Sequence, residues 1–143
     1  MHFSTKEELF IAAVPGTRDL AENLEGDPDG LPHRVAASFV RRMELADSAD
    51  PFIALVRTAA SDEQAAIPLL EEMWSESLAA YRRVLDGPDL DIKVDLIGAL
   101  LIGITFSRYV VRQGPLATMQ PDALVHYLTN SLREIMSGQP PAG

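Results

Sequence analysis

Two glutamates and an arginine share one side of a predicted helix and are the first candidates for chemistry. Glu72 and Glu76 are four residues apart, and Arg83 lies on the same side near the helix end. One interpretation is a carboxylate site at that end of the helix. The other is a solvated face with intrahelical ion pairs, because residues three or four apart on a helix are neighbours. We favour the solvated face.

Histidines and cysteines offer no stronger signal. His33 and His126 are single histidines with no carboxylate or second histidine at ligand spacing, so we expect surface or helix-cap roles for both. The chain has no cysteine, no GxSxG or HExxH motif, no glycine-rich phosphate loop and no Glu-x-x-His pair. The sequence therefore predicts a protein that is not an enzyme and has neither a metal site nor a cofactor.

Arg57 and Arg108 differ from the other charged residues, because each lies in an otherwise apolar helix. A charge in such a place must find a partner or lie at the mouth of a cavity. For Arg108 we consider a structural or interface ion pair first and a ligand contact second. Arg57 is assigned to a candidate pocket.

That candidate pocket is formed by large aromatic and methionine side chains on three predicted helices. Such a group is either plain core or the soft wall of an adaptable small-molecule site. A pocket of this composition would take a small hydrophobic or amphipathic ligand rather than a sugar or a nucleotide. Its predicted residues are Phe39, Met43, Phe52, Arg57, Met73, Trp74 and Tyr81.

The elements that position these residues are all helices. Apolar residues recur at helical spacing, strand patterns are absent, and the chain reads as an all-α bundle of about seven helices. Expected starts include a Ser4–Glu7 capping box, Asp50 followed by proline, and a cap at Ser61. Pro68 should kink the helix that contains it. The expected helices cover residues 4–14, 18–24, 31–46, 51–59, 61–86, 89–112 and 121–136.

The stretch from Ile92 to Arg112 organises the rest. It carries no charge between Asp95 and Arg108 and is apolar on every helix face. The uncharged run is shorter than the roughly 20 apolar residues that span a bilayer, so protein should cover it. The covering protein is either the rest of this chain, as around the core helix of a monomer, or a second copy of it.

We favour the second copy, with Gly98 and Gly103 letting helix backbones approach. The last helix, residues 121–136, would complete a four-helix interface of a homodimer. The predicted interface residues are Gly98, Leu101, Ile102, Thr105, Tyr109, Leu124, Leu128 and Leu132.

Composition sets the remaining bounds. The 143 residues fit one domain, and the formal net charge is −9 with scattered basic residues. This charge argues against nucleic-acid binding over a broad surface. We find neither a signal peptide nor a transmembrane segment, and expect a cytoplasmic protein.

The N-terminal residues carry the most specific resemblance. His2-Phe3 followed by residues 4–10, STKEELF, is similar to the junction between the DNA-binding and regulatory domains of the tetracycline-repressor (TetR) family. Downstream, the stretch RTAASDEQAA at 57–66 also resembles one branch of that family. So do Leu101, Ile102, Gly103, Arg108, Tyr109, Val110, Pro115, Leu116 and Ala117.

The resemblance implies a TetR-type ligand-binding and dimerisation domain, the regulatory part of a ligand-responsive repressor. Residues 1–14 would be a remnant of the DNA-binding domain with the connecting helix, 15–137 the regulatory domain and 138–143 a disordered tail. His2 and Lys6 would lie near the DNA backbone. DNA would be read only through a helix-turn-helix that precedes this sequence in family members and is missing from it. The alternative is a free-standing helical small-molecule-binding or interaction protein with no DNA-binding role.

Overall fold

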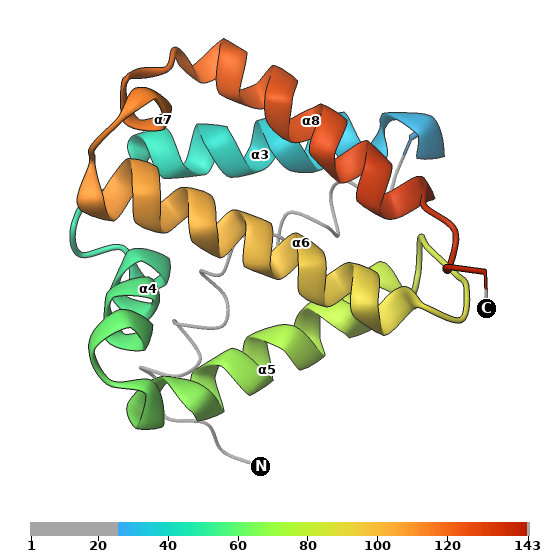
Figure 1. Cartoon of the computed structure of the whole chain (residues 1–143), viewed down its shortest axis with the longest axis horizontal. Coiled ribbons are helices and arrows are strands. Elements are labelled where there is room, and N and C mark those ends of the chain that lie inside the picture. The colour runs from blue at the N-terminus through green and yellow to red at the C-terminus, as the bar shows by residue number, and fades with distance from the viewer. Residues whose placement is uncertain (1–25, 143) are drawn as a thin grey trace.

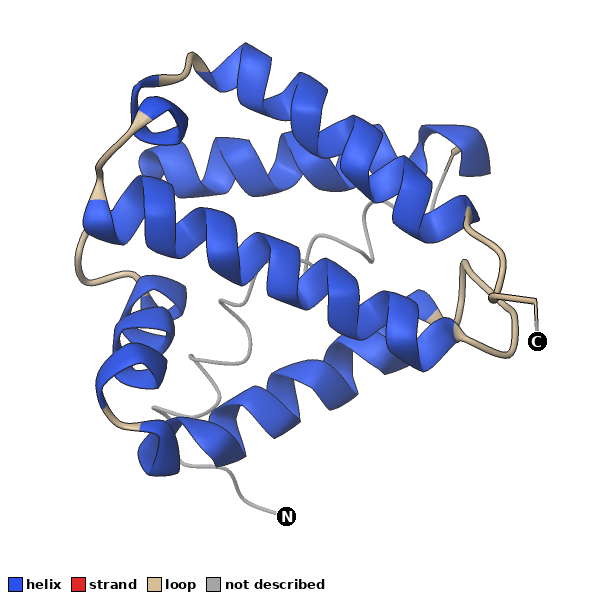
Figure 2. Cartoon of the chain, viewed as in Figure 1, coloured by secondary structure: helices blue, strands red, loops and turns tan. Residues whose placement is uncertain are grey.

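Helices account for all the regular secondary structure in residues 26–142, the part of the chain that the computed structural model describes (Figure 2). Within these residues a 3₁₀ turn, Pro28–Gly30, precedes six α-helices, and a π-helical segment, η2, spans Thr105–Val111. The α-helices are α3 (Leu31–Leu45), α4 (Pro51–Ser61), α5 (Glu63–Tyr81), α6 (Leu90–Ile104), α7 (Pro115–Thr118) and α8 (Pro121–Ser137). The all-α prediction is confirmed for these residues.

The five helices expected between residues 31 and 136 are all present, and the count of about seven was close. The sequence did not predict the four-residue α7 or the π-helical segment. Two expected helices, 4–14 and 18–24, lie outside the described residues, as do the Ser4–Glu7 cap, His2 and Lys6. Residues 138–142 form no helix or strand.

The helix formed by α6 and η2 crosses the middle of the molecule (Figure 1). The α6 part packs against α5 and α8, and η2 packs against α4 and α7. Helices α3 and α8 lie side by side and form the most extensive helix pair. The central role predicted for residues 92–112 therefore fits the observed packing.

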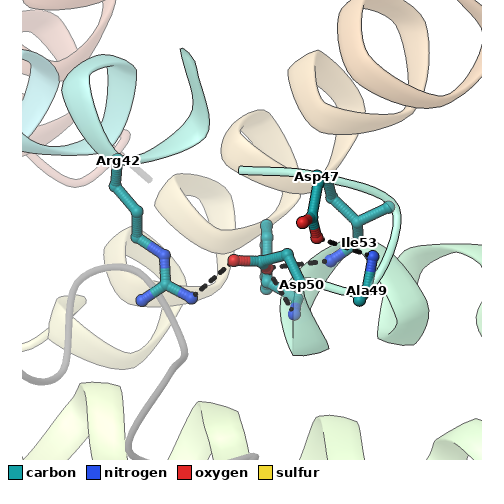
Figure 3. Close-up of polar contacts among 6 residues, drawn as sticks. Arg42, Asp47, Ala49, Asp50 and Ile53 are labelled. Atoms are coloured by element: carbon teal, nitrogen blue, oxygen red, sulfur yellow. Dashed lines mark hydrogen bonds and ion pairs between the residues drawn. The ribbon is translucent and has the colours of Figure 1, made fainter. Parts of the chain in front are cut away.

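Asp50 fixes the start of α4. Its carboxylate accepts hydrogen bonds from the backbone N–H groups of Phe52 at 2.8 Å and Ile53 at 3.3 Å. The same carboxylate pairs with Arg42 of α3 at 3.2 Å (Figure 3). One predicted cap thus serves two purposes, because it starts α4 and ties that helix to its neighbour.

The boundaries of α5 differ from the prediction at both ends. Asp62, not Ser61, caps the helix, accepting from the N–H of Ala65 at 3.2 Å, while the Ser61 hydroxyl donates to Arg57 O. The helix passes through Pro68 and ends at Tyr81 rather than near residue 86. An aspartate beside a serine offers two equivalent capping side chains, so sequence alone could not choose between them.

The central helix has one buried and one exposed face. Its buried residues recur at helical spacing: Leu90, Lys93, Val94, Ile97, Leu101, Ile104, Thr105, Arg108 and Tyr109. On the opposite side, Ile92 is 60% exposed and Leu96 51% exposed. The described residues therefore cover only part of this apolar helix and leave an apolar stripe exposed.

Leu90–Val111 is also a continuous 22-residue helical stretch, long and apolar enough to cross a membrane by length and composition alone. The sequence had indicated a shorter run, because only the uncharged residues were counted. The core helix of a domain in water meets the same criterion, and one such helix does not identify a membrane protein. Its buried face here packs against other helices of the chain.

Lys93 is a buried charge near the start of α6. Its ammonium donates to the backbone carbonyl of Met136 in α8 at 3.1 Å, and it lies 3.8 Å from the Asp89 carboxylate. Buried charges persist where they are paired and hydrogen-bonded. Lys93 therefore links the start of α6 to the end of α8.

Candidate ligand-binding site

A small cavity of about 30 Å³ lies between α5 and α6. One wall comes from Met73, Ser77 and Tyr81, which are spaced four residues apart and so share one face of α5. The facing wall and one end are formed by Val94, Ile97, Gly98 and Leu101 of α6 and by Phe52 of α4. Apolar groups therefore dominate the lining of this cavity.

Tyr81 lines the cavity and carries a deeply buried hydroxyl. Tyr81 is 2% exposed, and its hydroxyl oxygen has no hydrogen-bond partner. Burial raises the pKa of this phenol, because the charged phenolate would be poorly solvated there. Buried polar groups in folded proteins are nearly always hydrogen-bonded. The Tyr81 hydroxyl is an exception within the part of the chain that the structure describes, and surrounding atoms cover it rather than leaving it open to the cavity.

The cavity is small for a ligand site in this conformation. A water molecule needs roughly 10–15 Å³ of such space, whereas pockets for drug-sized ligands measure roughly 300–1,000 Å³. Met73 is the long, flexible member of the wall and the residue best able to move aside. Any ligand larger than a few atoms must therefore widen the space between α5 and α6.

Three of the seven predicted pocket residues line this cavity: Phe52, Met73 and Tyr81. Phe39 and Met43 are buried in the core elsewhere and do not line it. Arg57 is exposed on α4, and Trp74 is 38% exposed on α5, so neither forms the wall. Trp74 differs from Met73 because adjacent helix positions point about 100° apart, one inward and one outward.

Sequence reasoning missed Ser77, Val94 and Ile97. The four-residue spacing of Met73, Ser77 and Tyr81 was the available signal, since it places a serine between two predicted pocket residues. Gly98 and Leu101 were assigned to the dimer interface instead, and the structure places both in the cavity wall. Because the α6 residues are apolar on both sides of the helix, the sequence could not tell the cavity wall from a dimer interface.

Most predicted interface residues are buried within the single chain. They are Leu101, Thr105, Tyr109, Leu124, Leu128 and Leu132, while Gly98 and Ile102 are partly buried. Leu128, for example, is 2% exposed. These side chains belong to the chain's own core, which leaves different residues for any contact with a second copy. The exposed stripe consists of Ile92, Leu96, Gly103 and Phe106.

The two glycines of α6 also differ from the expectation. A Cβ added at Gly98 or Gly103 would meet no atom within 4 Å, so neither glycine is required for close packing within the chain. Gly98 faces the cavity, and Gly103 lies on the exposed side. Substitutions at the two glycines can therefore probe the cavity at Gly98 and the exposed surface at Gly103 on the same helix.

Arg108 is a structural residue. It is 7% exposed, pairs with Glu44 of α3 at 3.2 Å, and donates to the carbonyls of Leu116 and Met119 at 2.8 and 2.7 Å. Burial would lower its pKa, but the hydrogen bond and charge of Glu44 and the nearby Tyr109 together outweigh burial, so the pKa of Arg108 is raised. The first of the two predicted roles, an ion pair, is the observed one. The pair joins α3, η2 and the α7 turn.

Glu44 and Tyr109 complete the surroundings of Arg108. Burial raises the pKa of Glu44, yet the hydrogen bond and charge of Arg108, together with the nearby Tyr109, outweigh burial and leave the pKa below its usual value. Burial raises the pKa of Tyr109, and the nearby Glu44 carboxylate raises it further. The Arg108 guanidinium lies 5.4 Å from the centre of the Tyr109 ring. This cluster stabilises the fold, and its Tyr109 hydroxyl is buried without a hydrogen-bond partner in the described part of the chain.

The remaining candidates stay apart. Among the described residues, no ion pair joins Glu72, Glu76 and Arg83, and no group of three metal-ligating side chains gathers. His33 and His126 line the same open groove between α3 and α8, and both are exposed.

Comparison with known proteins now adds to this geometry. A family model described as tetracyclin repressor-like, C-terminal domain, matches residues 29–136. A crystal structure of a TetR-family regulator from Streptomyces coelicolor A3 superposes with a TM-score of 0.68 at 21% identity, covering 92% of this chain and 85% of that chain. No curated protein shows a significant match.

The helical fold of the described residues is shared with that regulator. The family model covers most of the described residues. The chain belongs to the TetR-like C-terminal domain family.

Proposed function

We propose that the chain is the regulatory and dimerisation part of a cytoplasmic, ligand-responsive transcriptional repressor. The observation that carries this proposal is the family match over residues 29–136. Fold-level likeness alone would be a weak basis, because one fold hosts many functions. Two features of the chain, the cavity and the exposed stripe, therefore have to supply the further support.

The cavity supports the sensing role. Its wall is mainly apolar, and it lies between the central helix and α5, two elements that must separate for a ligand to enter. A ligand shifts an equilibrium only by binding one conformation better than another. A molecule that fits the widened arrangement of α5 and α6 meets this condition. The proposed ligand is a small hydrophobic or amphipathic compound.

The exposed stripe on the central helix, formed by α6 and η2, supports the dimer. Contiguous apolar surface on a protein in water commonly marks an interaction site, and Ile92, Leu96 and Phe106 lie exposed along one side of the helix. Tyr127 of α8 is exposed as well. Two copies facing each other through a two-fold axis would cover both stripes. The buried surface should reach roughly 1,000 Å² in total if the contact is stable.

The net charge of −9 supports a division of labour in which DNA is bound by a separate helix-turn-helix domain. In this proposal His2 and Lys6, which lie outside the described residues, approach the DNA backbone. The described residues contribute ligand sensing and pairing. No catalytic role is proposed for them.

Deleting the gene in its host and measuring transcripts tests the proposal. A repressor's absence should raise the transcription of a small set of genes, and restoring the gene should reverse the rise. Unchanged transcription in several growth conditions would contradict a regulatory role. If the purified chain still bound a small molecule in that case, the free-standing binding protein would replace it.

A further inference from the structure

A groove of about 340 Å³ lies where the start of α3, the connection between α5 and α6, and the end of α8 meet. Figure 1 shows these three segments at the same end of the molecule. The volume falls within the range of roughly 300–1,000 Å³ that small-molecule sites occupy. The groove and the small cavity between α5 and α6 share no lining residue, so the groove is a separate place for a ligand.

The inner lining of the groove is apolar and belongs to the core. Leu31 of α3 is 2% exposed and Met136 of α8 is 8% exposed. Pro32 is buried beside them, and Leu85 of the α5–α6 connection is half-buried. Burying an apolar group against such side chains is favourable. The groove therefore suits the apolar body of a ligand.

Two opposite charges complete the lining. Asp29 and Arg133 are both exposed, and no ion pair joins them within the described residues. In that part of the chain the Arg133 guanidinium donates one hydrogen bond, to Asn130 at 3.0 Å. A guanidinium carries five N–H donors, so most of those of Arg133 are unused there. The groove thus offers a cation and an anion that do not neutralise each other.

We propose that this groove binds a small zwitterion with an apolar body, the chemistry of a free amino acid with a large aliphatic or aromatic side chain. The Arg133 guanidinium pairs with the ligand carboxylate, and the Asp29 carboxylate pairs with the ligand ammonium. A simple acid is attracted by one of these charges and repelled by the other, and so is a simple amine. The site therefore favours a molecule that carries both charges, and it goes beyond the proposed regulatory role.

A ligand in this groove connects segments that are far apart in the sequence. Leu85 belongs to the α5–α6 connection, whereas Arg133 and Met136 belong to α8. The Met136 carbonyl also accepts the hydrogen bond from Lys93, which anchors the start of α6 at the same point. A ligand that binds the folded chain alone stabilises it by mass action. Occupation of the groove should therefore raise the melting temperature of the chain.

Four compounds test the ligand class on the 143-residue chain in titrations followed by NMR. L-leucine carries both charges and an apolar body. The other three each lack one part: 4-methylpentanoate lacks the ammonium, 3-methylbutylamine lacks the carboxylate, and glycine lacks the apolar body. L-leucine should bind about threefold to fivefold more tightly than either single-charge compound, the usual size of one exposed ion pair. Glycine should bind more weakly than L-leucine.

Removing each charge from the protein should act selectively. Arg133→Gln should weaken L-leucine and 4-methylpentanoate about threefold to fivefold, without weakening 3-methylbutylamine. Asp29→Asn should weaken L-leucine and 3-methylbutylamine to a similar extent, without weakening 4-methylpentanoate. Arg41→Gln, at an exposed arginine of α3 that does not line the groove, is the control and should change none of the four.

A matched pair of serine substitutions on α8 tests the location. Ser137 is exposed and lines the groove, whereas Ser131 is exposed and does not line it. Ser137→Trp should fill the groove and abolish L-leucine binding, and Ser131→Trp should leave it unchanged. Because both serines are exposed, neither variant is expected to lose its fold, and circular dichroism verifies this. Binding is compared per subunit, so that a change in association does not alter the result.

Equal affinities for L-leucine and both single-charge compounds would overturn the proposal. So would unchanged L-leucine binding in Ser137→Trp, or in both Arg133→Gln and Asp29→Asn. If 4-methylpentanoate binds as tightly as L-leucine and Asp29→Asn has no effect, the groove holds a simple anion and the zwitterion is refuted. If none of the four compounds binds, the site itself is refuted. None of these results bears on the cavity between α5 and α6 or on the transcriptional role.

Discussion

The Arg108 guanidinium and the Glu44 carboxylate lie 3.2 Å apart although 64 residues separate them in the sequence. Through the same guanidinium, the carbonyls of Leu116 and Met119 are held against η2. One side chain thus joins the end of α3, the central helix and the turn that leads to α8. A single residue in this position should have a large effect on stability.

Arg108→Ala should lower the free energy of unfolding by about 2 kcal/mol or more, because it leaves a carboxylate and two carbonyls without their donor. Arg108→Lys should recover only part of this loss, since an ammonium lacks the planar arrangement of donors that reaches all three acceptors. Urea unfolding followed by circular dichroism gives the values. Arg41→Ala on the exposed side of α3 is the control and should change stability by less than about 0.5 kcal/mol. Equal effects at both arginines would refute the structural role of Arg108.

Alkaline pH should destabilise the chain through its buried tyrosines. The folded-state pKa of Tyr81 is raised, so its stabilising effect is complete below the unfolded pKa of about 10 and is lost as pH rises toward the folded value. Above pH 10, each such tyrosine lowers the free energy of unfolding by up to about 1.4 kcal/mol per pH unit. Tyr81→Phe should reduce the slope of unfolding free energy against pH by the contribution of up to one proton, about 1.4 kcal/mol per pH unit. An unchanged slope between pH 9 and 11.5 would contradict this assignment.

Glutamate substitutions at Leu96 and Leu128 should distinguish a residue of the dimer interface from a residue of the chain's own core. The wild-type chain should scatter light as a dimer. Leu96 is 51% exposed, so Leu96→Glu should give a monomer that keeps its helix content. Leu128→Glu places a charge in the chain's own core and should unfold it. Light scattering and circular dichroism on both variants distinguish the outcomes. A wild-type monomer at micromolar concentration would refute the dimer.

Replacing glycine with alanine should raise the stability of the chain at some positions and lower it at others. Gly98→Ala and Gly103→Ala should each stabilise the chain by up to about 1 kcal/mol, because alanine favours a helix interior and both sites have room. Gly87→Ala should destabilise it, since Gly87 has a φ of +118°, which side chains rarely adopt. Thermal melts of the three variants provide the comparison. A loss of stability in Gly98→Ala would contradict the open space found next to Gly98.

The sequence predicted best what depends on nearby residues. The start of α4 is an example, because Asp50 and Pro51 act on backbone groups within one turn. The apolar ridge of Leu31, Val35, Phe39 and Met43 was likewise readable from its spacing, and all four are buried. Local rules of this kind predict helices and most of the core.

What the sequence could not predict depends on contacts between distant helices. Leu101 and Leu96 are the same residue type on the same helix, yet one lies in the cavity wall and the other at the surface. No local pattern distinguishes them, because the central helix is apolar on both sides. The partner of Arg108 was equally out of reach, since Glu44 belongs to another helix. The family resemblance was correct, but it did not locate individual pocket residues.

The bond from Lys93 to the carbonyl of Met136 sets a limit on shortening the chain. Residues 138–142 lie beyond this carbonyl in no regular structure, so an affinity tag or a fluorescent fusion can replace them without touching the helices. A cut before Met136 removes the acceptor of a buried ammonium, and the resulting fragment should be unstable even though little of α8 is gone. The family match ends at residue 136 as well. Met136 is therefore the last residue that a minimal version of this domain must keep.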